Sequence, residues 1–212
     1  MDLLAQIAEK LLAGEDETVA QLTQQAIDQG LAPKQILDAG LIAGMNVVGE
    51  RFKAHEFFLP EVLLAARAMY AGMDRLKPLL AQEGVSARGR VVLGTVQGDL
   101  HDIGKNLVGI MLKGAGFEVV DLGNDVAPER FVDTATAQGA AVIGMSALLT
   151  TTMTGMKRVI DLVRQRTPDG RIKTIIGGAP VSAEFASEIG ADAYGFDAAS
   201  AVDRVKQLIG EG

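Results

Sequence analysis

The sequence predicts an α/β protein in which a helical N-terminal domain precedes a doubly wound parallel sheet. Up to about residue 82, apolar residues recur three and four positions apart, as they do on the buried faces of helices. After residue 90, short and nearly continuous apolar segments alternate with helical ones, as in parallel sheets buried on both faces. We therefore expect two domains, at residues 1–88 and 89–212.

The first domain is predicted to be an antiparallel four-helix bundle. Breaks at residues 14–16, 30–33 and 55–60 separate its helices, and the last break ends in a proline suited to the first turn of a helix. The fourth helix is expected at residues 60–82. A short polar segment with glycines, residues 83–90, is expected to link the domains.

The second domain is predicted to contain five strands that alternate with five helices. In such open sheets, ligands bind beyond the carboxyl ends of the strands, near the point where the strand order reverses. The loops at that edge are therefore the candidate site. The strands are expected at residues 90–96, 117–123, 140–146, 172–178 and 191–196, and the helices at 103–116, 128–139, 151–165, 181–190 and 198–210.

Composition limits the possible classes of function. The chain has 212 residues, 48% of them hydrophobic, and its net charge of -7 disfavours nucleic acid as a partner. It has no cysteine, which excludes disulfides and thiolate metal sites. No apolar run reaches the roughly 18 residues of a membrane span, and the N-terminus lacks the basic region of a signal peptide. We therefore expect a cytoplasmic protein without a membrane partner.

A histidine in the first loop of the sheet domain is the candidate functional residue. It lies in the sequence GDLHDIGKN, residues 98–106, whose glycines fit neither a dinucleotide fingerprint nor a phosphate loop. Asp99 precedes His101 by two positions, so its carboxylate can accept a hydrogen bond from one ring nitrogen and leave the other free. One histidine cannot build an ordinary zinc or iron site, but it suffices for a metal already held by a macrocycle.

The segment from Asp99 to Gly104 resembles the DxHxxG motif of cobalamin-binding proteins. Residues 45–69 resemble the helical cap that precedes the cobalamin domain in methionine synthase and in small corrinoid methyl-carrier proteins. The resemblance covers nearly the whole chain and implies a flavodoxin-like, Rossmann-like sheet domain. Two further elements, a Ser-x-Leu motif and a glycine pair, match at Ser146, Leu148, Thr150, Gly177 and Gly178.

The resemblance implies a role for each matching residue. His101 would be the lower cobalt ligand and the only metal ligand from the protein, with Asp99 bound to its other ring nitrogen. Glycines would leave a slot for the nucleotide tail of the cofactor, and Tyr194 would line the far end of that slot. The residues implied to contact the cofactor are Gly98, Asp99, Leu100, His101, Asp102, Ile103, Gly104, Ser146, Leu148, Thr150, Gly177, Gly178, Ala179, Tyr194 and Phe58.

For several side chains a simpler interpretation stays open. Phe58, just before a helix of the cap, is a candidate contact to the upper face of the cofactor, but Phe57 and Phe58 can equally belong to the bundle core. His55 is expected to be a surface residue. Lys105 can shape the loop or meet amides of the cofactor, although most charged residues in such loops are solvated.

The resemblance also implies a function, that of a methyl carrier. A substrate-specific methyltransferase would load a methyl group onto the cobalt of cob(I)alamin, or a related corrinoid, to give methylcobalamin. A second methyltransferase would pass it to tetrahydrofolate or coenzyme M. We expect a carrier subunit of a methyltransferase system without a complete active site of its own, reactivated by a reductive activase. The donor is open among methanol, methylamines, betaines and methoxylated aromatics.

Two other functions are weaker alternatives. A cobalamin-dependent light sensor or regulator is disfavoured by the absence of tryptophan and of a basic face. The small subunit of a cobalamin mutase is disfavoured by the four-helix domain.

Overall fold

The computed structural model describes residues 2–83 and 87–210, which form two compact units. One unit comprises the chain up to Ala87 together with Gly114–Gly116, and the other comprises Arg88–Lys113 and the chain from Phe117 onward. Residues 84–86 of the predicted linker lie outside the described residues. The helical and the strand-containing parts of the sequence thus pack into separate units.

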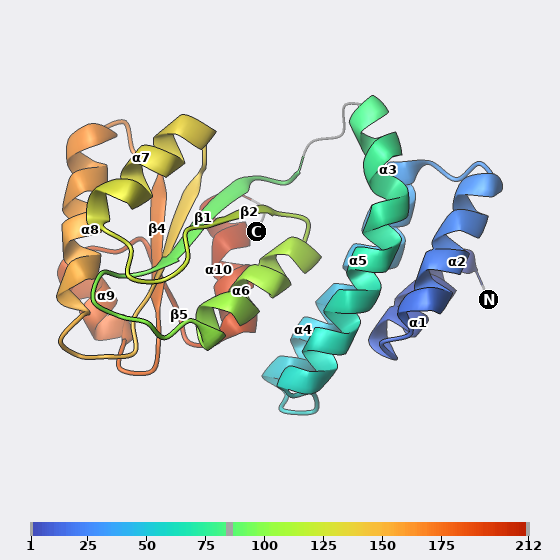
Figure 1. Ribbon diagram of the computed structural model, residues 1–212, viewed down its shortest axis with the longest axis horizontal. Coiled ribbons are helices and arrows are strands. Elements are labelled where there is room, and N and C mark those ends of the chain that lie inside the picture. The colour runs from blue at the N-terminus through green and yellow to red at the C-terminus, as the bar shows by residue number, and fades with distance from the viewer. Residues whose placement is uncertain (1, 84–86, 211–212) are drawn as a thin grey trace. The chain divides into compact units, whose positions relative to one another are not determined.

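The first unit is the predicted bundle of four helical segments (Figure 1). The third segment contains an unpredicted π-helical stretch, and the glycines there allow close packing, since a Cβ at Gly44 would lie 3.2 Å from the backbone of Ala8. Pro60 lies in the first turn of the last helix, as predicted. The bounds are α1 (Leu3–Leu12), α2 (Asp16–Asp28), α3 (Pro33–Ile36), the π-helix η1 (Leu37–Ile42), α4 (Ala43–Lys53) and α5 (Leu59–Gln82).

The second unit is the predicted doubly wound parallel sheet, with strand order β2-β1-β3-β4-β5. Helices α6 and α10 cover one face of the sheet, and α7, α8 and α9 cover the other (Figure 1). The strands are β1 (Arg90–Thr95), β2 (Glu118–Asp121), β3 (Val142–Ser146), β4 (Lys173–Gly177) and β5 (Ala193–Gly195). The helices are α6 (Ile103–Gly114), α7 (Pro128–Gln138), α8 (Thr154–Arg166), α9 (Ala183–Ile189) and α10 (Ala198–Leu208).

The register of the sheet brings residues from four strands into one row at its carboxyl edge. Thr95 pairs with Ser146, Ser146 with Gly177, and Gly177 with Gly195. The order of the strands reverses between β1 and β3, so the loops after these two strands flank the crevice where such sheets bind ligands. Within the described residues, no helix combines the length and the apolar character needed to cross a bilayer.

Candidate functional site

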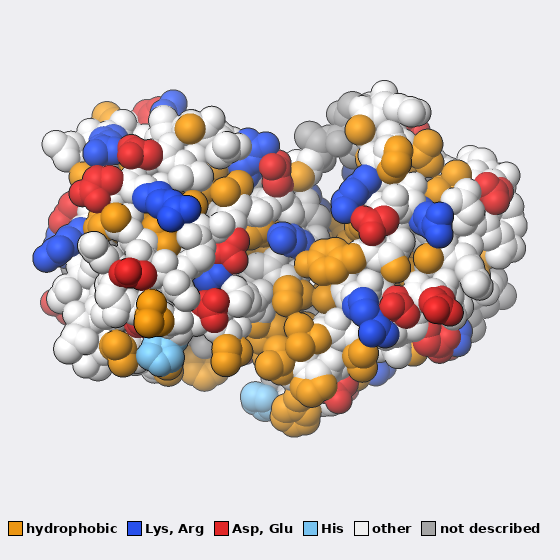
Figure 2. Space-filling model, in the orientation of Figure 1, with side chains coloured by type: hydrophobic (Ala, Val, Ile, Leu, Met, Phe, Trp, Pro, Cys, Tyr) orange, Lys and Arg blue, Asp and Glu red, His pale blue; other side chains and the backbone are white. Residues whose placement is uncertain are grey.

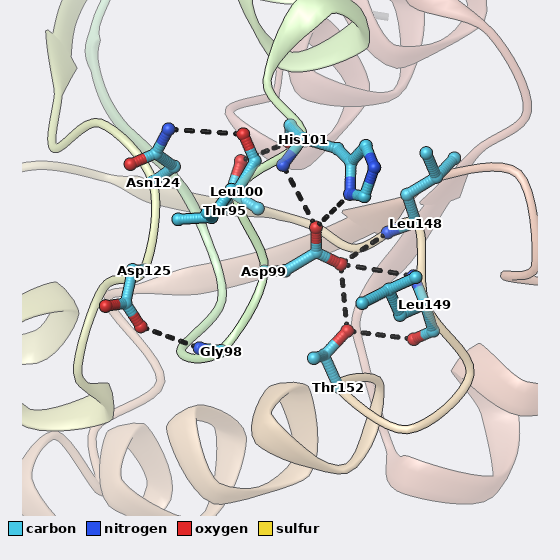
Figure 3. A network of polar contacts seen from close by, with 10 residues as sticks. All are labelled: Thr95, Gly98, Asp99, Leu100, His101, Asn124, Asp125, Leu148, Leu149 and Thr152. Carbon is cyan, nitrogen blue, oxygen red and sulfur yellow. Dashed lines mark hydrogen bonds and ion pairs between the residues drawn. The ribbon is translucent and has the colours of Figure 1, made fainter.

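Asp99, in the loop between β1 and α6, is a buried carboxylate surrounded by hydrogen-bond donors (Figure 3). Its Oδ1 accepts a bond from the backbone N–H of His101 at 3.1 Å and lies 2.8 Å from Nδ1 of that ring. Its Oδ2 accepts bonds from the N–H groups of Leu148, at 2.8 Å, and Leu149, at 3.1 Å. The hydroxyl of Thr152 donates to the same oxygen at 2.9 Å. The loops after β1 and β3 are thus joined through one side chain.

These donors keep Asp99 ionised despite its burial. Burial alone would raise the pKa of the carboxyl group, but hydrogen bonds from Leu148, His101 and Thr152 hold that pKa well below its usual range. An ionised carboxylate can only accept hydrogen bonds, so Nδ1 of His101 carries the hydrogen. In the neutral imidazole, Nε2 therefore keeps a free lone pair.

The ring of His101 is available to a metal. Its side chain is 52% exposed, whereas that of Asp99 is completely buried. The described part of the chain contains no group of three or more His, Asp or Glu side chains that could hold a metal ion. A metal already held by a macrocycle could accept the ring of His101 as a further ligand.

A cavity of about 240 Å³ lies between the carboxyl half of the sheet and helices α6 and α10. It is bordered mostly by apolar or glycine residues, in keeping with a site for a small organic ligand. Five of the predicted site residues line it. These are Gly104, Ser146, Gly177, Gly178 and Ala179.

The three glycines implied to leave space for a ligand differ in what a side chain at each position would meet. A Cβ on Gly104 would meet no atom within 4 Å, so this glycine faces open space. A Cβ on Gly177 would lie 2.9 Å from the carbonyl oxygen of Gly195. A Cβ on Gly178, whose φ is +133°, would lie 1.9 Å from the carbonyl oxygen of Ala147. The backbone itself therefore requires glycine at Gly178, and a slot for a ligand explains only Gly104.

Comparison with known proteins identifies the family. Two different families, each described as a B12 binding domain, match the chain, one over residues 89–203 and the other over residues 3–77. The chain belongs to the B12-binding family. It is 41% identical over 214 residues to a corrinoid protein of Desulfitobacterium hafniense, a match that covers 100% of this chain and 99% of the relative.

Two further comparisons extend this result. The chain is 42% identical over 209 residues to a dimethylamine corrinoid protein of Methanosarcina barkeri, with 98% of each chain covered. A structure of a methanol:cobalamin methyltransferase complex from the same organism matches with a TM-score of 0.86 and 33% identity. That match covers 99% of this chain and 80% of the other. The cobalamin cofactor expected from the sequence is confirmed by family membership.

The residues of the site fit a cobalamin. The exposed imidazole of His101, with Nε2 free, could hold the cobalt that a bound cobalamin would supply. Gly104 keeps the wall of the adjacent cavity open. In this B12-binding unit, the side chains of Leu100 and Ile103 are 69% and 73% exposed next to His101, which gives the site an apolar rim.

Two predicted site residues, Tyr194 and Thr150, do not border this cavity. Tyr194 does not border the cavity but packs against the core on the other face of the sheet. Side chains alternate along a strand, so Gly195, the next residue of β5, borders the cavity instead, together with the 77% exposed Phe196 just beyond the end of the strand. Thr150 is exposed, and Thr152, in the turn that follows β3, is the threonine that contacts Asp99.

Lys105 is buried, so of the interpretations left open for it, a solvated charge is wrong and a role in shaping the loop fits. Its side chain is 3% exposed, and Nζ lies 2.6 Å from both carboxylate oxygens of Asp121 and 2.7 Å from Oδ1 of Asn106. Burial favours a higher pKa for Asp121, but bonds from Lys105 and from the N–H of Gly123 lower it below its usual range. The first turn of α6 is thereby tied to the end of β2. The carbonyl oxygen of Asp102, just before α6, accepts a hydrogen bond from the N–H of Asn106 at 2.8 Å.

In the helical unit, hydrophobic side chains gather at the surface of α4 and α5 (Figure 2). Phe58 is 60% exposed, so its assignment to the bundle core is wrong. Phe57 is half-buried, with the guanidinium of Arg51 5.2 Å from its ring centroid. His55 lies at the surface, as expected. The exposed hydrophobic residues of these two helices and of the turn between them include Val47, Phe58, Leu59, Leu63 and Tyr70.

Proposed function

We propose that this chain is a methyl carrier that works between two methyltransferases, with His101 as the lower ligand of its cobalt. The observation that carries the proposal is the contact between Asp99 and Nδ1 of His101, which leaves Nε2 as the free donor of an exposed ring. Two relatives support the reaction class, one named a dimethylamine corrinoid protein and one solved in a methanol:cobalamin methyltransferase complex. Bound cobalamin supplies a cobalt that can accept and release a methyl group.

The residues of the chain would hold and tune this ligand. The negative charge of Asp99 on one side of the imidazole raises the electron density at Nε2 and fixes the orientation of the ring. The bonds from Leu148, Leu149 and Thr152 keep Asp99 in place, so the position of the ring depends on the loop after β3 as well as on its own. The cavity next to Gly104 would take the nucleotide tail of the cofactor.

The exposed face of α4 and α5 would shield the reactive side of the cofactor. Phe58 and Leu63 present apolar surface there, and an apolar cover excludes water from a reactive alkyl group. We expect the partners to be a substrate-specific methyltransferase, an acceptor methyltransferase that uses tetrahydrofolate or coenzyme M, and a reductive activase. We place this exchange in the cytoplasm.

The ligand assignment is tested by reconstituting the chain with hydroxocobalamin and recording its absorption spectrum. His101→Ala should change the spectrum and weaken binding by about tenfold or more. His55→Ala is the matched control because His55 is the other histidine of the chain and lies exposed in the helical unit. An unchanged spectrum in His101→Ala would exclude His101 as the ligand. Transfer of labelled methyl groups from methanol or a methylamine, with the matching methyltransferase added, tests the carrier function.

A further inference from the structure

The backbone of the loop that ends at His101 is held at four consecutive residues (Figure 3). Three of these contacts come from the loop between β2 and α7, and the fourth comes from the end of β1. The N–H of Gly98 donates to Oδ1 of Asp125 at 2.7 Å, and the N–H of Asp125 donates to the carbonyl of Asp99 at 3.0 Å. Nδ2 of Asn124 donates to the carbonyl of Leu100 at 3.2 Å, and Oγ1 of Thr95 donates to that of His101 at 3.0 Å.

Asp125 makes these contacts from a strained conformation. Its φ is +51°, and within the described residues only one other non-glycine residue, His55, has a φ in the left-handed region. Non-glycine residues adopt this region rarely, and the conformation persists where the surrounding structure requires it. In this conformation Asp125 directs both its N–H and its carboxylate toward the loop that carries His101.

The loop between β2 and α7 is itself anchored to the sheet. The N–H of Thr95 donates to the carbonyl of Gly123 at 3.0 Å, and the N–H of Val126 donates to the carbonyl of Thr95 at 3.0 Å. The N–H of Gly123 also donates to Asp121 at 2.9 Å. Asn124 and Asp125 therefore lie between two points that are fixed to the edge of the sheet.

We propose that Asn124 and Asp125 are positioning residues for the cobalt ligand. The proposal rests on the proposed function, in which His101 binds cobalt. Asp99 fixes the ring of His101 through its side chain, and Asn124 and Asp125 fix the backbone from which that ring projects. Without this support the imidazole would still be oriented by Asp99, but its Nε2 would no longer be held at one place.

Variants of Asp125 in the full chain, reconstituted with hydroxocobalamin, test this role. Asp125→Ala should bind cobalamin about tenfold more weakly and show a fraction of cofactor whose spectrum matches that of His101→Ala. Asp125→Asn should stay within about twofold of the wild type, because its amide oxygen can accept from Gly98 and asparagine tolerates the left-handed region. Asp161→Ala, at an exposed ion pair with Lys157 on α8, is the control and should change neither property.

The outcomes separate this proposal from the ligand assignment. If His101→Ala changes the spectrum but Asp125→Ala does not, the positioning role is wrong and the ligand assignment stands. If Asp125→Asn loses as much affinity for cobalamin as Asp125→Ala, the hydrogen bond from Gly98 to residue 125 is not what supports binding, and the proposal also fails. Where Asp125→Ala does not fold, Asn124→Ala decides, since it removes only the bond to Leu100. A spectrum and affinity equal to the wild type in that variant overturns the proposal.

Discussion

The Asp99 network and the cavity lie at the same edge of the sheet, but the first consists of hydrogen-bonded polar groups and the second is lined mainly by apolar residues and glycines. Around Asp99, four residues of two loops converge on one buried carboxylate. The cavity is lined largely by glycine, alanine and aliphatic residues. A site made of hydrogen bonds is sensitive to a change of donor or acceptor. A cavity is sensitive to the size of the side chains that line it. Substitutions that change hydrogen bonding and substitutions that change side-chain volume should therefore have different effects at the two places.

Gly178→Ala should have the largest effect, and the effect should be on folding. The added methyl group would lie 1.9 Å from the carbonyl oxygen of Ala147, at a φ of +133°. Overpacking and backbone strain together should lower the free energy of unfolding by about 4 kcal/mol. Denaturant unfolding of the protein without cofactor measures this. Unfolding like that of the wild type would show that the strand edge can relax.

Asp99→Asn should be the next most damaging change. The amide nitrogen would face N–H donors, so we expect the free energy of unfolding to fall by about 3 kcal/mol. Because the folded pKa of Asp99 is below its usual range, its ionised form stabilises the fold above the unfolded pKa of about 3.9. This stabilisation is lost as the pH falls below that value. In the variant, the free energy of unfolding should fall less between about pH 4 and pH 2 than in the wild type. If it falls equally in both proteins, the ionised carboxylate of Asp99 is not the source of this pH-dependent stability.

Gly104→Leu should weaken the binding of cobalamin without harming the fold. Since a Cβ at this position meets no atom within 4 Å, the leucine side chain can enter the cavity. We expect affinity to fall about tenfold, or ~1.4 kcal/mol. The free energy of unfolding of the protein without cofactor should be unchanged or slightly higher, because glycine is a poor helix former and Gly104 lies in α6. Gly104→Ala should lose less affinity, and equal affinity in all three proteins would mean that the cavity does not hold the cofactor.

Phe196→Ala should have the smallest effect, again on binding alone. The side chain is 77% exposed at the border of the cavity, so its removal should leave the unfolding of the free protein unchanged. Loss of its apolar surface should weaken cobalamin binding about threefold. Phe196→Leu keeps most of that surface and should bind like the wild type. Titration of the cofactor followed by absorbance measures the difference, and identical affinities for the alanine variant and the wild type would remove Phe196 from the site.

The comparison also shows which features could be predicted from the sequence. The order of helices and strands follows from apolar spacing, and it was predicted correctly for the five strands and the four-helix unit. The contact between Asp99 and His101 was predicted as well, because two residues of spacing place the groups within reach of each other. Both depend only on neighbours along the chain.

Contacts between distant segments could not be derived in this way. The run Thr150 to Thr152 offers three hydroxyl groups, and only the path of the loop after β3 selects Thr152 as a partner of Asp99. Lys105 is buried because α6 packs beside the end of β2, where Asp121 lies. Each of the two residues has a partner that is distant in the sequence, Asp99 for Thr152 and Asp121 for Lys105.

The sequence by itself determined the order of the elements, the glycine-containing loop and the local pair of Asp99 and His101. The tertiary structure decided which donors surround Asp99, which side of β5 faces the cavity, and that Asn124 and Asp125 hold the loop of His101. The physical reason is that spacing along one segment fixes local geometry, whereas the register between β1, β2 and β3 fixes which loops meet at the edge of the sheet.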